Sequence, residues 1–346
     1  MFFRPLKILI VKLSSLGDVL HTLPVVHDIT TALPNAQIDW VVESSFAGVV
    51  RQCRGVNNVI TCELRKWKKA PLSTETCQAW SSFKTELQHE NYDAVIDLQG
   101  LTKSALVSWL AKLSVSGKRY AMANRTEGSS YEAPTRWVAG VAIRLEPHIH
   151  AVQRARELCA KALDYKIDDI QQKIPLFGLE SGVFIDNNAI NNIAKSIIFA
   201  HGSSREDKLW PIDNWVELGL RLHAEGLGVA IVHGSDVEKL RSESIAKELI
   251  KSQVEVNVLP RLGLDVLLDV LGSSAGVVGV DSGLSHMAVA LDLPHVQIYN
   301  SDTAWRTGPV ASNQSARQVS IYAQPTPTVD AVWQAWLAVN SQTQTA

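Results

Sequence analysis

Four short loops combine acids, hydroxyls and glycines in patterns that could bind phosphate and move a proton. The first reads Lys12-Leu13-Ser14-Ser15-Leu16-Gly17-Asp18, and its acid begins a helical run. The others are His201-Gly202-Ser203-Ser204, Gly234-Ser235-Asp236-Val237-Glu238 and Asp281-Ser282-Gly283-Leu284-Ser285-His286. Small residues let a backbone approach an anion, and a following helix offers free N–H groups and the positive end of its dipole. The loops predict phosphate binding, with Lys208 as a countercharge and Asp18 as a candidate general base.

Each of these residues also has a purely structural interpretation. Asp18 could be a helix N-cap, Ser203 and Ser204 could cap a turn, Asp281 could cap the GLSH helix, and Glu238 could be a solvated acid in a first helical turn. The narrow nucleotide-binding motifs are absent from the sequence, since no GxGxxG follows the first strand and no GxxxxGK[ST] occurs. Their absence argues against kinases, ATPases and dehydrogenases.

The elements around these loops alternate between apolar strands and helices. In the first half, strands are expected over 6–12, 38–42, 58–62, 93–99 and 117–122. Helices are expected from Asp18, with a bend at Pro24, and over 74–90, 101–113 and 150–163. The stretch 124–147 is expected to be irregular. A polar stretch, 164–195, is expected to be a linker. The alternation then resumes with strands over 196–202 and 228–234 and helices over 210–226 and 236–251, and it ends in a helix over 328–340. The pattern predicts an α/β protein of two doubly wound domains, 1–175 and 176–346, whose ligands lie at the carboxyl ends of the strands.

Composition limits the class of protein and its partners. The 346-residue chain has a net charge of −2, which argues against a general nucleic-acid binder. Residues 1–175 carry 22 Lys and Arg against 17 Asp and Glu (+5), whereas residues 176–346 carry 11 against 18 (−7). A basic first half suits an anionic substrate or a membrane surface, and an incidental imbalance is the alternative.

The first residues and the cysteines both argue against an exported protein. No apolar run reaches the roughly 18 residues of a membrane-spanning helix, and the first residues lack a signal-peptide cleavage site. The four cysteines have neither CxxC spacing nor a histidine at metal-ligand spacing. They are expected to be reduced thiols in a cytoplasmic protein.

Four stretches, in this order, resemble the bacterial heptosyltransferases of lipopolysaccharide inner-core synthesis: ILIVKLSSLGDVLHTLP, DAVIDLQGLTKSA, DKLWP and VGVDSGLSHMAVALDLP. The SSLGDVLHTLP form is more similar to the first inner-core enzyme of this family than to the second. The resemblance implies a GT-B fold, in which two Rossmann-like domains face each other across a cleft and the last helix crosses back to the N-terminal domain. It also implies inverting transfer of L-glycero-D-manno-heptose from ADP-heptose to the first Kdo sugar of Kdo-lipid A, with no metal and no other cofactor.

The resemblance assigns roles to matching positions. Asp18 matches the general base, on the N-terminal acceptor-binding domain. On the C-terminal nucleotide-sugar domain, Ser203 and Ser204 match a hydroxyl pair on phosphate and Lys208 matches the phosphate-binding lysine. Glu238 matches an acid on the nucleoside ribose, and Asp281 an acid on the heptose hydroxyls. The donor-binding set also includes Ser282, Gly283, Leu284 and His286; the helix start at Gly283 is expected against the pyrophosphate, and His286 is expected to pack in that helix rather than act as a base.

Acceptor binding is expected in the first domain, from Ser15, Gly17, Arg65, Lys66, Lys68, Lys69, Gln99 and Lys103. Kdo carboxylates and lipid A phosphates are anionic, and arginine and lysine bind such groups. For the basic run, a solvated surface is the alternative. Trp67 within it is expected near acceptor or lipid. The expected partners are ADP-heptose and Kdo-lipid A, with peripheral contact at the inner face of the cytoplasmic membrane, no nucleic acid and a monomeric state.

The sequence departs from the family pattern in two places, and rival functions stay open. The usual Thr-Thr pair is Ser203-Ser204, which keeps the hydroxyls, and Asn300-Ser301-Asp302 replaces a Gly-Pro-Thr-like turn. One rival is a related transferase with another acceptor, such as the second inner-core enzyme or a capsule transferase. Another is a two-domain nucleotide-sugar epimerase, which would turn over its donor without an acceptor. The third is a nucleotide-binding protein without catalytic activity.

Overall fold

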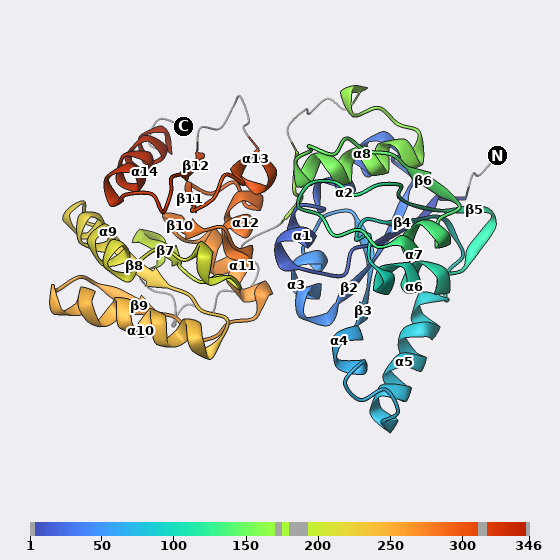
Figure 1. The fold of residues 1–346 in the computed structure, drawn as a ribbon, viewed down its shortest axis with the longest axis horizontal. Coiled ribbons are helices and arrows are strands. Elements are labelled where there is room, and N and C mark those ends of the chain that lie inside the picture. The colour runs from blue at the N-terminus through green and yellow to red at the C-terminus, as the bar shows by residue number, and fades with distance from the viewer. Residues whose placement is uncertain (1–3, 170–174, 180–192, 311–316, 344–346) are drawn as a thin grey trace. The chain divides into compact units, whose positions relative to one another are not determined.

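The computed structural model describes residues 4–169, 175–179, 193–310 and 317–343. The chain divides into two compact units, Met1–Leu179 and Glu180–Ala346, where the sequence pattern had placed the boundary after residue 175. The expected linker over 164–195 lies largely outside the described residues. Each unit contains one six-stranded sheet, with helices packed on both faces (Figure 1).

The first unit begins with a strand and continues as an alternation of strands and helices. Its strands are β1 (Lys7–Val11), β2 (Gln37–Glu43), β3 (Val56–Cys62), β4 (Tyr92–Asp97), β5 (Leu113–Met122) and β6 (Val141–Ile143). Its α-helices are α1 (Leu16–Leu20), α2 (Pro24–Ala32), α3 (Ala47–Arg51), α4 (Leu64–Trp67), α5 (Thr74–Leu87), α6 (Thr102–Leu110), α7 (Ala133–Val138) and α8 (Ala151–Leu163). Single 3-10 turns occur at η1 (Ser44–Phe46) and η2 (Ile167–Asp169).

The second unit repeats this alternation. Its strands are β7 (Ser196–Ala200), β8 (Gly228–Ile231), β9 (Val256–Val258), β10 (Gly276–Val280), β11 (His295–Tyr299) and β12 (Gln318–Tyr322). Its α-helices are α9 (Ile212–Ala224), α10 (Asp236–Lys251), α11 (Leu264–Gly272), α12 (Gly283–Ala290), α13 (Ala304–Thr307) and α14 (Val329–Thr343). Two 3-10 turns, η3 (Ile193–Lys195) and η4 (Glu206–Lys208), flank β7.

Both sheets have the doubly wound topology. The first has the order β3-β2-β1-β4-β5-β6 and the second β12-β11-β10-β7-β8-β9, with parallel pairing throughout. In each, the chain first winds one way from the central strand and then returns to its other side. The switch points lie between β1 and β4 and between β7 and β10, and ligands of such folds bind at the carboxyl ends of these strands. The predicted α/β class and doubly wound build are confirmed.

Apolar side chains of the strands and helices form the cores. In the first unit, Leu9, Val11 and Val95 pack with Phe83 of α5 and Val107 of α6. Figure 1 shows α2 and α8 together on the opposite side of this sheet. In the second unit, the strand residues pack against α9, α10 and α14. No helix among the described residues is long and apolar enough to cross a bilayer.

Two expectations from the sequence need correction. The stretch 124–147 is not wholly irregular, because it contains α7 and the edge strand β6. The sequence did not predict either element, because α7 spans only six residues and β6 only three, too few for a hydrophobic period to be recognised. The helix expected from Asp18 is two helices, α1 and α2, and Pro24 is the first residue of the second, where its missing N–H costs nothing.

The family resemblance leads us to expect that the last helix crosses back to the first domain; within the second unit, the structure shows where the apolar face of this helix packs. Val332, Trp336 and Val339 of α14 are buried in the core of the second unit, against β11, β12 and α9. The edge of the Trp336 ring fills the space beside Gly276, where a side-chain β-carbon would lie only 2.6 Å from it. The apolar face of α14 is therefore used within its own unit.

Candidate active site

The two switch points hold most of the candidate residues. In the first unit, the loop after β1 carries Ser15 and Asp18, and the loop after β4 carries Gln99 and leads to Lys103. In the second unit, the loop after β7 carries the serine pair and Lys208, and the loop after β10 carries Asp281. Parallel pairing brings each pair of loops to one sheet edge, as the strand pattern predicts.

Asp18 lies in the first turn of α1, but it is not the N-cap. Ser15 occupies the cap position, and Asp18 Oδ2 accepts hydrogen bonds from the Ser15 N–H (3.1 Å) and hydroxyl (2.9 Å). Its other oxygen, Oδ1, lies 3.8 Å from Lys12 Nζ, and the side chain remains 41% exposed. One oxygen thus fixes the carboxylate, and part of the side chain stays open to solvent.

Electrostatics keep Asp18 ionised. Burial by itself would raise the pKa of Asp18, but the Lys12 ammonium, the two hydrogen bonds from Ser15 and the charge of Arg154 hold the pKa below its usual value. Lys12 is almost fully buried and donates to the Leu98 carbonyl (2.9 Å). Burial lowers the pKa of Lys12, and the neighbouring Asp18 opposes that shift. Asp18, Lys12 and Arg154 all line one small pocket.

Residues after β4 shape the Asp18 loop. Gln99 Oε1 accepts the N–H groups of Leu13 and Ser14, each at 3.1 Å, and Lys103 Nζ donates to Ser14 Oγ (2.7 Å). Beneath them, Asp97 is buried and accepts from the N–H groups of Gln99 and Gly100. Burial raises the pKa of Asp97 to about 6, and these bonds oppose the shift. Gln99 and Lys103 therefore hold the loop that carries the acid, and their binding of acceptor stays a prediction.

The basic run lies on α4 and the turn after it. Arg65, Lys66, Lys68 and Lys69 are exposed, and Lys66 pairs with Glu63 at 3.2 Å. The expectation that Trp67 lies near acceptor or lipid stays a prediction. Trp67 is only 8% exposed and packs on Trp80 and Phe83 of α5. Its four-residue helix turns the lysines outward by burying the ring.

Lys208 and Asp281 form the centre of the second unit's site. Lys208 Nζ lies 2.6 Å from Asp281 Oδ2, and His286 Nε2 lies 3.4 Å from Asp281 Oδ1. Burial by itself would raise the pKa of Asp281, but His286 and the Lys208 ammonium hold it well below the usual range. His286 does more than pack, because its imidazole holds the second oxygen of this acid.

The helix after Asp281 presents its N-terminus beside this pair. Ser282 is the N-cap of α12 and Gly283 its first residue, so Asp281 is not the cap. The buried Ser282 hydroxyl has no hydrogen-bond partner among the described residues. Leu284 is half-buried in the first turn. Gly279, at the end of β10, has no room for a side chain, because a β-carbon there would lie 2.3 Å from Ser285 Oγ.

Glu238 spans two loops. It sits in the first turn of α10, and its Oε2 accepts the Gly234 N–H at 2.6 Å. Its carboxylate also lies against Gly202, where a β-carbon would come within 2.6 Å of Oε1. The alternative interpretation of Glu238 as a solvated first-turn acid is therefore incomplete, because this acid connects the loop after β8 to the loop after β7.

The serine pair lies in the turn after β7, beyond buried His201. Ser203 Oγ accepts the Arg205 N–H at 3.4 Å, and Ser204 is exposed. His201 Nε2 bonds Ser242 Oγ at 2.7 Å, and burial lowers the pKa of His201 to about 4. A neutral histidine thus supports the turn, and the hydroxyls of the serine pair stay available for a ligand.

Sequence reasoning missed Lys12 and Arg154 as parts of the site. Lys12 stands in the quoted loop, but its depth became visible only with the packing of β1. Arg154 lies on the buried face of α8 and donates to Thr126 Oγ1 at 3.2 Å. An arginine in step with the apolar residues of an amphipathic helix was the available signal, because a buried charge needs partners.

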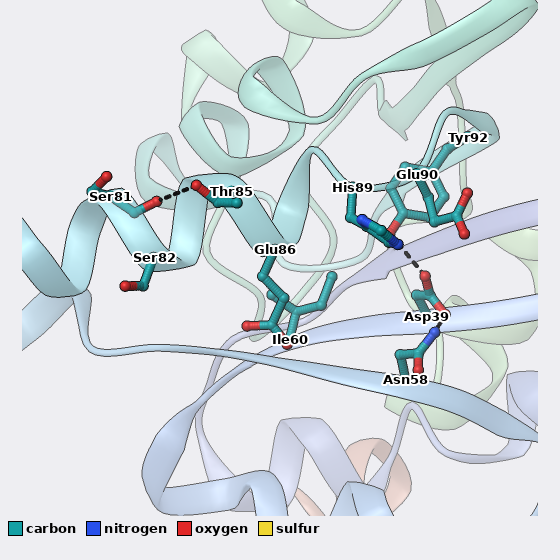
Figure 2. Close-up of a pocket in the computed structure, with 10 residues that line it drawn as sticks. All are labelled: Asp39, Asn58, Ile60, Ser81, Ser82, Thr85, Glu86, His89, Glu90 and Tyr92. Carbon is teal, nitrogen blue, oxygen red and sulfur yellow. Dashed lines mark hydrogen bonds between the residues drawn. The ribbon is translucent and has the colours of Figure 1, made fainter.

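One further pocket of the first unit does not belong to this site. A pocket of about 560 Å³ lies at the amino ends of β2, β3 and β4 (Figure 2), the sheet edge opposite Asp18. Its buried Asp39 already accepts from Asn58 and Tyr92, both at 2.8 Å.

Within 4–169, 175–179, 193–310 and 317–343, no group of three His, Cys, Asp or Glu could hold a metal ion.

Comparison with known proteins gives one consistent family. The model of glycosyltransferase family 9 (heptosyltransferase) matches residues 80–335. Lipopolysaccharide heptosyltransferase 1 of Escherichia coli K12 is 36% identical over 314 residues, which cover 89% of this chain and 92% of that protein. The Pseudomonas aeruginosa protein of the same name is 35% identical, with 89% and 82% covered.

A solved structure agrees. E. coli heptosyltransferase WaaC with ADP has a TM-score of 0.81 and 31% identity, and the match covers 95% of this chain and 98% of that one. The likeness extends over both units, and WaaC has the GT-B fold that the four sequence stretches implied. On its sequence, its fold and the residues at its two switch points, this chain belongs to glycosyltransferase family 9, the heptosyltransferases.

Proposed function

We propose that this chain transfers L-glycero-D-manno-heptose from ADP-heptose to the first Kdo of Kdo-lipid A, with inversion at the anomeric carbon. The observation that carries the proposal is the 36% identity to lipopolysaccharide heptosyltransferase 1 over 89% of the chain. The site geometry agrees with it. An ionised acid sits at one switch point, and a lysine beside a helix N-terminus sits at the other.

In the first unit, Asp18 acts as the general base. Its carboxylate takes the proton of the acceptor hydroxyl, and the oxygen then forms a bond to the anomeric carbon of the heptose. The hydrogen bonds from Ser15 fix the Oδ2 atom of Asp18, and the orientation of the carboxylate leaves Oδ1 to accept the proton. When the acceptor covers the exposed part of the side chain, added burial raises its basicity.

In the second unit, Lys208 and α12 stabilise the leaving group. The bond from the anomeric carbon to the diphosphate breaks, and its electron pair leaves with ADP. The Lys208 ammonium uses one of its three N–H groups in a hydrogen bond to Asp281, so the other two can donate to phosphate. The N–H groups at the start of α12 and the Ser282 hydroxyl add donors to the same charge. In this proposal Asp281 binds the heptose hydroxyls and Glu238 binds the ribose, the roles that the family resemblance assigns to them.

Release of ADP from ADP-heptose tests this function against its rivals. The purified protein should release ADP when Kdo-lipid A is present and should release almost none without it, and excess chelator should not slow it. An epimerase would consume ADP-heptose without an acceptor. A nucleotide-binding protein would bind ADP and release none from the donor. Faster turnover on a heptosylated core than on Kdo-lipid A would instead favour the second inner-core reaction.

We also propose that the first unit touches the inner face of the cytoplasmic membrane. Large apolar side chains are exposed on this unit: Leu72 (92% exposed), and Leu106 and Trp109 on α6 (41% and 61%). A groove of about 420 Å³ is lined by Leu106 of α6, by Trp67 and Trp80, and by Lys68 and Lys103. Exposed apolar groups flanked by cations suit an anionic lipid surface.

A further inference from the structure

The side chain of Asn300 is fully engaged with the loop that carries Lys208. Asn300 follows β11, and its Nδ2 donates to the carbonyls of Asp207 (3.1 Å) and Leu209 (3.0 Å). Its Oδ1 accepts the Thr326 hydroxyl at 2.7 Å. The two carbonyls flank Lys208 in the chain, so one amide grips the backbone on both sides of that lysine.

The loop needs such a grip. Lys208 ends η4, a single 3-10 turn that is held internally by two hydrogen bonds, Lys208 N–H to Arg205 O (3.2 Å) and Leu209 N–H to Glu206 O (3.0 Å). Such short turns have poor hydrogen-bond geometry. The position of the Lys208 ammonium is therefore well defined only if contacts outside the turn fix the backbone of this residue.

Asn300 links that backbone to the strand beside Asp281. The Asp281 N–H donates to the Ile298 carbonyl at 3.1 Å, which locks the end of β10 to the end of β11 just before Asn300. The same strand end therefore sets the positions of Asp281 and, through Asn300, of Lys208. This connection explains how the 2.6 Å pair is held across two separate loops.

We infer that Asn300, oriented by Thr326, is a positioning residue for Lys208 in donor binding. The inference rests on the proposed function, in which Lys208 binds the pyrophosphate of ADP-heptose. Asn300 acts through the lysine and needs no contact with the donor.

Two pairs of variants test the inference. Asn300→Asp keeps the shape but places a carboxylate oxygen against two carbonyls, and Thr326→Val removes the hydroxyl that orients the amide. Thr326→Ser keeps that hydroxyl and is the matched control. We expect Asn300→Asp to weaken ADP binding in calorimetry about ten-fold, the size of one or two net hydrogen bonds. Thr326→Val should show a smaller loss and Thr326→Ser none, and KM for the acceptor should not change.

A double variant separates positioning from mere stability. If Asn300 acts through Lys208, Asn300→Asp should weaken ADP binding no further once Lys208→Ala is present. Equal losses in both backgrounds, or full ADP affinity in folded Asn300→Asp and Thr326→Val, would overturn the inference. Normal ADP affinity in Lys208→Ala alone would remove the proposed role of that lysine, and the positioning role with it.

Discussion

Asp18 shows how one carboxylate can accept hydrogen bonds from the N-cap residue of its helix and still leave an oxygen available for chemistry. Ser15 engages Oδ2, while Oδ1 faces Lys12 and solvent. A cap alone would need only the first of these contacts. The buried Lys12 beside it keeps the acid ionised at neutral pH, which a general base requires.

Replacing Asp18 separates the two roles. Asp18→Asn keeps an oxygen that can accept from Ser15 but removes most of the basicity. We expect kcat to fall by roughly 100-fold or more, the usual contribution of a general base, with ADP-heptose affinity nearly unchanged. Turnover close to that of the wild type would leave Asp18 as a capping residue only.

At the scale of elements, α4 turns its basic side chains outward because Trp67 anchors it to α5. Changing Lys66, Lys68 and Lys69 to Gln should raise KM for the anionic acceptor and leave donor binding unaltered. Acceptor affinity should also depend less on salt, because screening acts on exposed charges.

A matched set of lysines controls for charge alone. Lys239, Lys247 and Lys251 are exposed on α10 of the second unit. Their change to Gln alters the net charge equally and should leave acceptor kinetics intact. If both triple variants behave alike across a salt series, α4 is a solvated surface.

Helix α6 presents an outward stripe that a purely solvated helix would not have. Leu106→Ser with Trp109→Ser should weaken binding to vesicles that contain anionic lipid by roughly ten-fold or more, because burying such side chains is worth about 1.5–3 kcal/mol each. Leu240→Ser on α10, also exposed, is the control. Unchanged co-sedimentation of the α6 variant with the vesicles would place the membrane contact elsewhere.

At the scale of the whole molecule, the two units should respond to acid in opposite ways. Burial lowers the pKa of His201 and His295, both in the second unit, to about 4. Between pH 6.5, the usual pKa of histidine, and pH 4, these two histidines are protonated in the unfolded chain but stay neutral in the folded unit. The free energy of unfolding of this unit should therefore fall as pH drops, by about 4 kcal/mol between pH 7 and pH 5.

In the first unit, the raised pKa of Asp97 has the reverse effect. The folded unit keeps a proton up to about pH 6, whereas an unfolded aspartate loses it near 3.8. Acidification through this window should therefore stabilise the first unit. Hydrogen exchange of the amides in β1 and β4, compared with β7 and β10, would measure both responses. Parallel loss of protection in both units at pH 5 would contradict this assignment.

Local patterns in the sequence determined a good part of this protein. Continuous apolar runs such as LKILIVK and DAVIDLQ specify strands buried on both faces, and their alternation with helices leaves few topologies other than a doubly wound sheet. Because ligands meet such sheets at the carboxyl ends, the positions of Asp18, Lys208 and Asp281 just after strands already indicated a site. The resemblance to the family then supplied their roles.

Contacts between distant parts of the chain decided the rest. The depth of Lys12, the turn of Trp67 into the core and the packing of α14 within its own unit depend on which surfaces meet, and no local pattern records that. The same holds for Arg154 beside Asp18 and for Asn300 beside Lys208, which are separated by more than 90 residues. Hydrophobic periodicity describes which face of an element is buried, whereas charge balance, pKa values and hydrogen-bond partners arise only when the folded chain brings those faces together.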